Sequence, residues 1–154
     1  MPITIIPATI QDIDKIISFI RITYDDAVAP NYTKQGNEEF YKYLDSKAMQ
    51  ERLKKNHWIL KASDQTDLSG VIEIRDNNHL SMLFVKTDKQ RQGIGRKLLS
   101  AAIEVIKGKN SNQKTLTVHS SPNSVTAYEK MGFESSGKEQ VVNGIRFTTM
   151  QMHL

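Results

Sequence analysis

The amino-acid sequence predicts an α+β fold with a mixed, largely antiparallel sheet that is flanked by helices. Three observations predict it. Several segments repeat apolar residues at helical spacing, several others are short runs rich in β-branched and aromatic residues, and some of these runs follow one another with only brief polar turns between them. Runs that close together pair as antiparallel hairpins, whereas runs separated by a helix require crossovers. No repeat or low-complexity linker divides the 154 residues, so we expect a single domain over residues 1–154.

The N-terminal part of the chain is expected to form one strand and two helices. Residues 3–7 form the strand, and Thr9 can cap a helix that reaches Ile22. The apolar stripe of this helix comprises Ile13, Ile16, Ile17 and Ile20. Residues 25–36 contain proline, asparagine and glycine and are expected to be a loop. A second helix is expected from about Asn37 to Lys55, with apolar positions at Phe40, Tyr41, Leu44, Met49 and Leu53.

The middle of the chain predicts three strands and a helix. HWILKA (57–62), GVIEIRD (70–76) and HLSMLFVKT (79–87) are expected to be strands joined by tight turns. After Gly95 the pattern becomes helical, with one apolar face formed by Ile94, Leu98, Ala102 and Val105.

The C-terminal part predicts a strand, a short helix and two further strands. KTLTVHS (114–120) is the strand. The helix that follows has Ser121 as its cap and Pro122 in its first turn, and it ends at Gly132. The last strands are expected over about 133–140 and 144–152, joined near Asn143-Gly144.

Composition excludes several classes of site. The chain has no cysteine, so disulfides and thiolate chemistry are absent, and its four scattered histidines lack metal-ligand spacing. The N-terminus MPITIIPATI resembles neither a signal peptide nor a spanning helix, so we expect a cytoplasmic protein with no membrane partner. The net charge of +4 suits an anionic small ligand, and no basic-aromatic run favours nucleic acid.

Residues 90–99, QRQGIGRKLL, place two glycines where a helix is expected to begin. Glycine disfavours a helix, but it lets the backbone approach an anion, which the free N–H groups and the dipole of a helix N-terminus stabilise. Arg91 and Arg96 add positive charge. The segment therefore predicts a phosphate-binding loop; the alternative is a surface turn. A third glycine of the dinucleotide fingerprint and the Gly-Lys-Ser/Thr of a P-loop are both missing.

Two motifs resemble those of the GCN5-related N-acetyltransferases, the GNAT superfamily. Gln90-x-x-Gly93-x-Gly95 resembles the acetyl-coenzyme A loop of that family, and SSPNSVTAYEKMGF (120–133) resembles its second cofactor motif, which ends in Y-x-x-x-G-F. The order of predicted strands and helices matches from Ile3 to Leu154.

This resemblance implies the GNAT fold, in which the strands through Val85 and Val118 splay apart around acetyl-CoA, the co-substrate, with no metal. The pantetheine arm is expected to pair with the backbone of Leu83, Phe84 and Val85 as an added strand would. The pyrophosphate is expected on the loop formed by Arg91, Gln92, Gly93, Ile94, Gly95 and Arg96.

The resemblance also implies catalytic roles. Tyr128 falls on the tyrosine that protonates the departing thiolate; the alternative is a half-buried aromatic that only packs. Ser121 stands where many members have asparagine, and it is expected to contact the pantetheine, whereas no role is transferred to Asn123. A backbone N–H near Val85 is expected to meet the oxyanion.

The general base is left open between several groups. Glu73 lies on one strand face with Val71 and Arg75, and it is expected either to take the amine proton or to form an ion pair with Arg75 or another base. His119 and His79 are further candidates, as is water.

We therefore expect an N-acetyltransferase in which a primary amine attacks acetyl-CoA directly in a ternary complex. The alternatives are a silent acetyl-CoA sensor and, less favoured, a nucleic-acid-binding domain. The acceptor, a small-molecule or peptide amine, is expected to be selected by residues 24–55 and the last strands, where the acidic residues Asp25, Asp26, Glu38 and Glu39 could attract a cation. Acyl groups other than acetyl and a homodimer are both left open.

Overall fold

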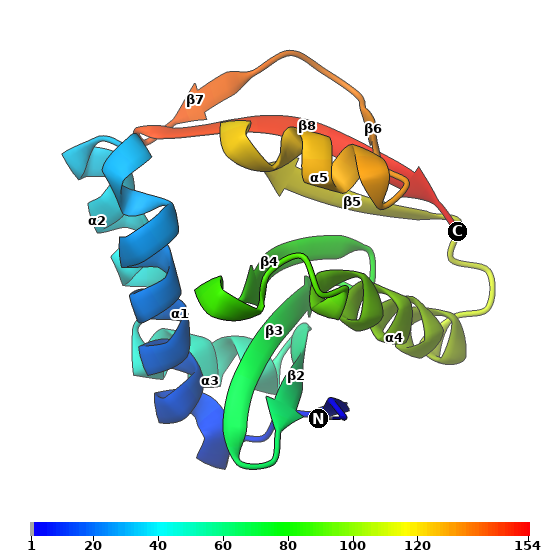
Figure 1. Cartoon of the computed structure of the whole chain (residues 1–154). Helices are drawn as coiled ribbons and strands as arrows, with labels where there is room; N and C mark the ends of the chain where they lie inside the picture. Colours follow the sequence, from blue (N-terminus) through cyan, green and yellow to red (C-terminus); the bar gives the residue numbers. More distant parts are fainter. Residues whose placement is uncertain (1) are drawn as a thin grey trace.

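The computed structural model describes residues 2–154 and contains one mixed sheet with helices on both faces (Figure 1). Its spatial strand order is β1-β2-β3-β4-β5-β8-β6, and β7 pairs with β8. Among the strands of residues 2–154 only the β4–β5 pair is parallel, which confirms the predicted α+β class with a largely antiparallel sheet. The strands are β1 Thr4–Pro7, β2 His57–Asp64, β3 Asp67–Arg75, β4 His79–Val85, β5 Thr115–Ser120, β6 Glu134–Ser135, β7 Gln140–Val142 and β8 Ile145–His153.

Two sets of helices cover opposite faces of the sheet. The helices are α1 Ile13–Ala27, α2 Lys34–Tyr43, α3 Ser46–Lys54, α4 Ile94–Lys109 and α5 Val125–Lys130. Val71 of β3 packs with residues of α1 and α3, whereas its neighbour Ile72 packs with residues of α4 and α5. Successive strand residues point to opposite faces, so the apolar run of β3 serves two cores. Each fully buried aliphatic side chain there contributes roughly 1.5–3 kcal/mol.

The parallel pair at the centre of the sheet is very short. β4 and β5 pair only at His79–Thr117 and Leu80–Val118. Beyond these residues β4 stays paired with β3 as far as Val85, and β5 stays paired with β8 as far as Ser120, so the two strands part (Figure 1). This confirms the expected splay of the two central strands.

The predicted second helix, residues 37–55, is wrong as a single element. The structure has α2 and α3 instead, separated at Leu44 and Asp45. Asp45 accepts a hydrogen bond from the Ala48 N–H at 3.0 Å and caps α3, while Thr33 caps α2 by accepting from the Gly36 N–H at 3.1 Å. The apolar stripe runs through the break, which is why the pattern conceals it.

Other boundaries differ at the ends of elements. α1 continues to Ala27, so the loop expected from residue 25 begins later. The strand expected over 133–140 is wrong, since β6 has two residues and β7 begins only at Gln140. The Asn143-Gly144 turn is confirmed, and its φ angles of +53° and +79° are those of a type I′ hairpin. Within residues 2–154 we find no helix with the length and apolarity to cross a membrane.

Candidate active site

The glycine loop leaves the N-terminus of α4 uncapped. Gly93 precedes the helix with φ +81°, and no side chain accepts from the first amides of α4. Arg91 also adopts a left-handed φ, +66°. The side-chain Nε2 of Gln90 donates to the Val85 carbonyl at 3.2 Å, which connects the loop to the end of β4. Unpaired amides at a helix N-terminus favour an anion. This loop can therefore hold a phosphate group.

Packing does not require the second glycine. A Cβ built on Gly95 would lie 3.7 Å from Val85 Cγ2 and 4.0 Å from Leu83 Cδ2, which are ordinary contacts. The φ of Gly95 also lies outside the left-handed region. The bare backbone at Gly95 therefore has no reason in the fold itself.

The two loop arginines differ in their contacts. Both Arg91 and Arg96 are exposed. Arg96 donates from its guanidinium to the Lys130 carbonyl at 3.0 Å, at the C-terminal end of α5. This bond joins the loop to the helix that carries Tyr128, so part of the hydrogen-bonding capacity of Arg96 is already used.

The edge of β4 that faces the splay exposes the backbone of Leu83 and Val85. The Lys86 N–H donates to the Ser69 carbonyl at 2.8 Å, so Lys86 and Ser69 are a hydrogen-bonded pair. Hydrogen-bonded and non-bonded pairs alternate along an antiparallel ladder. Phe84 therefore directs its backbone groups to β3, whereas Leu83 and Val85 direct theirs to the open edge. Of the three residues expected to bind pantetheine through the backbone, Leu83 therefore offers both backbone groups and Val85 its N–H, while the Val85 carbonyl already accepts from Gln90 Nε2.

Tyr128 lies in the core beneath this edge. Its side chain is 8% exposed, and its ring packs edge-on against Phe133 with the centroids 5.4 Å apart. Leu83 and Val85 pack against the same cluster of buried residues. Burial raises the pKa of the Tyr128 phenol, so it stays protonated as a hydrogen-bond donor. Ser121 lies at the start of the motif, and its hydroxyl donates to Ser124 Oγ at 2.9 Å.

Glu73 is 1% exposed, and its carboxylate accepts hydrogen bonds from several side chains. Arg52 donates to its carboxylate from Nε at 2.9 Å and from a terminal nitrogen at 3.3 Å, and the Tyr43 hydroxyl donates at 3.1 Å. Nδ1 of His57 contacts the same carboxylate. Burial alone would raise the pKa of Glu73, but the hydrogen bonds from His57 and Arg52 and the Arg52 charge outweigh it and lower the pKa.

Glu73 does form an ion pair, the alternative expected for it, but with Arg52 rather than with Arg75, which pairs with Asp76 at 3.8 Å. The sequence did not indicate the actual partners. Arg52 lies on α3 and His57 at the start of β2, and only the β2–β3 register, with Ile59 opposite Glu73, brings them to the carboxylate. No local pattern signals such a register.

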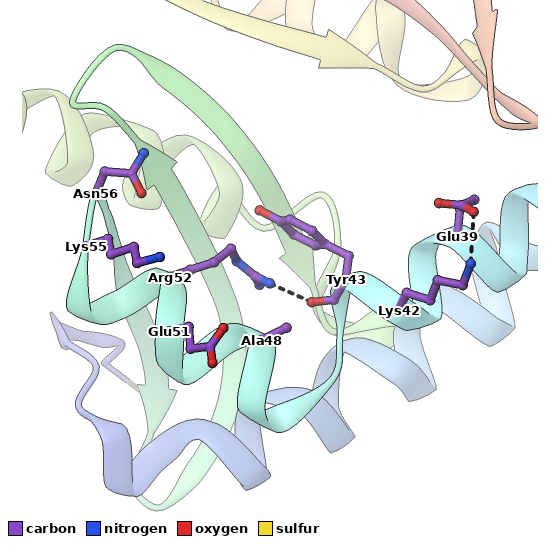
Figure 2. Close-up of a pocket in the computed structure, with 8 residues that line it drawn as sticks. All are labelled: Glu39, Lys42, Tyr43, Ala48, Glu51, Arg52, Lys55 and Asn56. Atoms are coloured by element: carbon purple, nitrogen blue, oxygen red, sulfur yellow. Dashed lines mark hydrogen bonds and ion pairs between the residues drawn. The ribbon is translucent and has the colours of Figure 1, made fainter.

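An open hollow of about 470 Å³ lies beside this cluster (Figure 2). Arg52 lines this hollow and donates to the Tyr43 carbonyl at 2.7 Å. Its guanidinium carbon also lies 3.6 Å from the centroid of the Tyr43 ring. None of the residues expected to bind acetyl-CoA lines it. The lining residues are Glu39, Lys42, Tyr43, Ala48, Glu51, Arg52, Lys55 and Asn56.

Two histidines lie where β4 and β5 part. His79 is 6% exposed, and its Nδ1 is 2.7 Å from Thr117 Oγ1. Burial is the main cause that lowers the pKa of His79 to about 4, and the positive charge of Arg75 adds to it. His119 is exposed, lies edge-on to His79 at 4.7 Å and stacks on Phe147 at 4.5 Å. Burial of part of the ring and the charge of Arg75 lower the pKa of His119 as well.

The acidic residues considered for the acceptor all have partners. The Tyr41 hydroxyl donates to Asp25, and Thr87 donates to Asp26 at 3.1 Å. The other two form exposed ion pairs, Lys34–Glu38 at 4.0 Å and Lys42–Glu39 at 3.2 Å. They do not form an unpaired acidic cluster. Among residues 2–154 no group of three or more His, Cys, Asp or Glu side chains is placed to hold a metal ion.

Comparisons with known proteins identify the family. The model of the acetyltransferase (GNAT) domain matches residues 28–154. No curated protein matches the chain.

Several solved structures share the fold. The GCN5-related N-acetyltransferase from Rhodopseudomonas palustris is 21% identical with a TM-score of 0.85, and the match covers 100% of this chain and 97% of that one. PaiA N-acetyltransferase from Thermoplasma acidophilum, solved with coenzyme A, is 20% identical with a TM-score of 0.82, covering 100% of both chains. A spermidine N-acetyltransferase SpeG chimera from Vibrio cholerae and hSSAT is 18% identical with a TM-score of 0.65, covering 99% and 96%.

The domain match covers most of the chain, and the splayed strands and glycine loop agree with it. Members of this family use acetyl-CoA to acetylate amines. The chain belongs to the GNAT family of acetyl-CoA-dependent N-acetyltransferases.

Proposed function

We propose that this protein transfers the acetyl group of acetyl-CoA to a primary amine by direct attack within a ternary complex. The observation that carries the proposal is the open edge of β4, which ends at the uncapped N-terminus of α4. A strand edge and a helix N-terminus in succession offer hydrogen bonds to an amide-containing arm and then to a diphosphate.

The donor would lie along this edge. Leu83 and Val85 would pair with the pantetheine amides, and the amides from Arg91 to Arg96 would receive the pyrophosphate. Gly95 leaves room between the loop and β4, and Arg91 supplies charge from its exposed side chain. Ser121 faces the arm from the β5 side in this arrangement.

The chemistry requires an unprotonated amine, a stabilised oxyanion and a proton for the thiolate. Tyr128 would donate to the sulfur, because its phenol is protonated and its core packing reaches Leu83 and Val85. A backbone N–H of the open β4 edge would meet the oxyanion. Direct attack needs no covalent acyl-enzyme, which agrees with the absence of cysteine.

The acceptor is a small-molecule or peptide amine. The SpeG chimera is a spermidine acetyltransferase, but the acidic residues here are each engaged by a neighbour, so they offer no unpaired site for a polycation. A monoamine is the first acceptor to test.

The test is a screen of the purified protein with acetyl-CoA against spermidine, ethylamine, phenethylamine and lysine peptides, following release of free thiol. Acetylation of any of these amines supports the proposal. Binding of acetyl-CoA in a calorimeter without transfer to any amine would instead support a sensor.

A further inference from the structure

We infer that His119 is the general base that takes the proton from the attacking amine. The inference rests on the proposed acetyl transfer and adds the residue that completes it. It follows from the place of His119 in the splayed sheet, from the face to which its ring points, and from the contacts of the competing residues.

His119 lies at the point where the central strands separate. The last β4–β5 pair is Leu80–Val118, so His119 is the first residue of β5 beyond it. A pantetheine arm that pairs with Val85 and then Leu83 runs toward this point. The thioester at the end of the arm therefore arrives beside His119.

The ring of His119 points away from Tyr128. Val118 and Ser120 are buried, and Val118 belongs to the core cluster of Tyr128. His119 lies between them and is exposed, so it projects from the other face of the strand. The leaving group thus meets Tyr128 on one face, and an amine that approaches from the opposite face meets His119.

The competing bases are occupied. The carboxylate of Glu73 is buried, receives hydrogen bonds from Arg52 and Tyr43 and contacts His57, and these contacts lower its pKa, so it is a weak acceptor for an amine proton. His79 is buried and uses Nδ1 on Thr117.

The surroundings keep the His119 imidazole neutral and oriented. Phe147 of β8 stacks on the ring and His79 of β4 meets it edge-on. The charged group that lowers its pKa is Arg75 of β3, and Thr149, its pair on β8, is uncharged. A neutral ring at neutral pH is the form that accepts a proton.

The proton balance closes. The amine nitrogen forms a bond to the acetyl carbon, and the carbon–sulfur bond breaks. An ammonium nitrogen loses two protons in becoming an amide: His119 takes the first before the attack and the second after the nitrogen–carbon bond has formed, and it releases each to water. Tyr128 gives one proton to the departing thiolate and regains one from water, so the products are the amide and free coenzyme A.

The experiment compares His119→Gln with wild type, using ethylamine and trifluoroethylamine as acceptors. Ethylamine is protonated at neutral pH, whereas trifluoroethylamine is largely neutral there. We expect kcat/KM for ethylamine at pH 7 to fall by about 10²-fold in His119→Gln, which is the usual contribution of a general base. The loss should be much smaller with trifluoroethylamine and should shrink as the pH rises. His153→Gln, an exposed histidine at the far end of β8, is the matched control and should behave as wild type.

Calorimetry separates this inference from the proposed function. Acetyl-CoA should bind His119→Gln as it binds wild type; a wild type that binds no acetyl-CoA would contradict the proposed function itself. Equal losses for both amines at every pH, or no loss, would overturn the role of His119. A second readout needs no acceptor: acetyl-CoA should shift the ring resonances of His119 in NMR spectra, and unchanged resonances would also overturn it.

Discussion

At the scale of single residues, burial decides which proton each side chain can handle. Tyr128 is surrounded by apolar groups, and its pKa is raised by burial alone. Such a phenol donates a hydrogen bond strongly only to a basic partner, and a departing thiolate becomes one as its bond to carbon breaks.

Tyr128→Phe tests this role. The variant keeps the ring against Phe133 and removes only the hydroxyl, so turnover should fall by about 10²-fold with the free energy of unfolding nearly unchanged. Acyl donors with thiols of different acidity provide the measurement. The defect should shrink as the leaving thiol becomes more acidic; a constant defect would mean that Tyr128 only positions the thioester.

Substitution of Glu73, unlike that of Tyr128, should lower the free energy of unfolding strongly. Glu73→Gln removes the charge that Arg52 and His57 surround, and leaving a buried charge unpaired reduces stability by about 3–5 kcal/mol. The folded pKa of Glu73 lies below its ordinary 4.5, so its contribution is full above that pH and is lost as the pH falls through the folded pKa. Urea unfolding of both proteins from pH 7 to pH 3 should show their difference narrowing at the acidic end. A difference that does not change with pH would contradict the ionised pair.

At the scale of elements, α2 and the β7–β8 hairpin hold each other beside the splayed strands. A Cβ on Gly36 would lie 2.6 Å from the Gly144 carbonyl oxygen, and Thr33 Oγ1 is 3.4 Å from the same oxygen. The hydroxyl of Tyr32 donates to the Arg146 carbonyl at 3.2 Å. These contacts join segments far apart in the sequence and fix the start of α2 against the β7–β8 hairpin.

Gly36→Ala should therefore destabilise the protein by about 1–3 kcal/mol, since the new methyl group meets backbone that cannot turn aside. Gly108→Ala is the matched control in α4, where a Cβ meets nothing within 4 Å, and it should stabilise by up to about 1 kcal/mol. Denaturant titrations measure both. Equal effects of the two substitutions would show that the α2–hairpin contact is loose.

The sequence predicted elements well where a pattern ends at a turn, and poorly where the apolar pattern continues past the end of an element. The Asn143-Gly144 turn was predictable because asparagine and glycine readily adopt the positive φ angles that this turn requires. The break at Leu44 and Asp45 has a local signal, the capping side chain of Asp45, but the apolar stripe continues across it to Met49 and conceals that signal.

At the scale of the whole molecule, the two predicted motifs consist of residues close together in the sequence, whereas the partners of Glu73 come from distant parts of the chain. The glycine loop and the Tyr128 motif are local, so their resemblance to the motifs of the family located them in the sequence. The partners of Glu73 are gathered from α2, α3 and β2 by strand register and helix packing, which the sequence does not state. The faces of Tyr128 and His119 likewise become clear only once β5 is placed between β4 and β8.

Acetyl-CoA should stabilise the whole protein, because it would bind between the two halves of the sheet. The two halves of the sheet, β1 to β4 and β5 to β8, are joined in the ladder by only two residue pairs. A ligand that pairs with the open edge bridges the halves, and a ligand that binds only the folded state adds about 2.7 kcal/mol at a hundredfold excess over its Kd. We therefore expect acetyl-CoA to raise the melting temperature.

Hydrogen exchange locates that effect. Amides of Leu83 and Val85 face the open edge and should exchange quickly in the free protein, then gain protection with acetyl-CoA, together with those of the loop from Arg91 to Arg96. The Phe84 amide, already bonded to β3, should change little. Gly95→Val is the control, because a branched side chain between the loop and β4 should abolish acetyl-CoA binding in a folded protein and remove both effects. Protection spread evenly over β1 and α3 would instead indicate global stabilisation without a ligand strand, and wild-type affinity in Gly95→Val would remove the loop from the binding site.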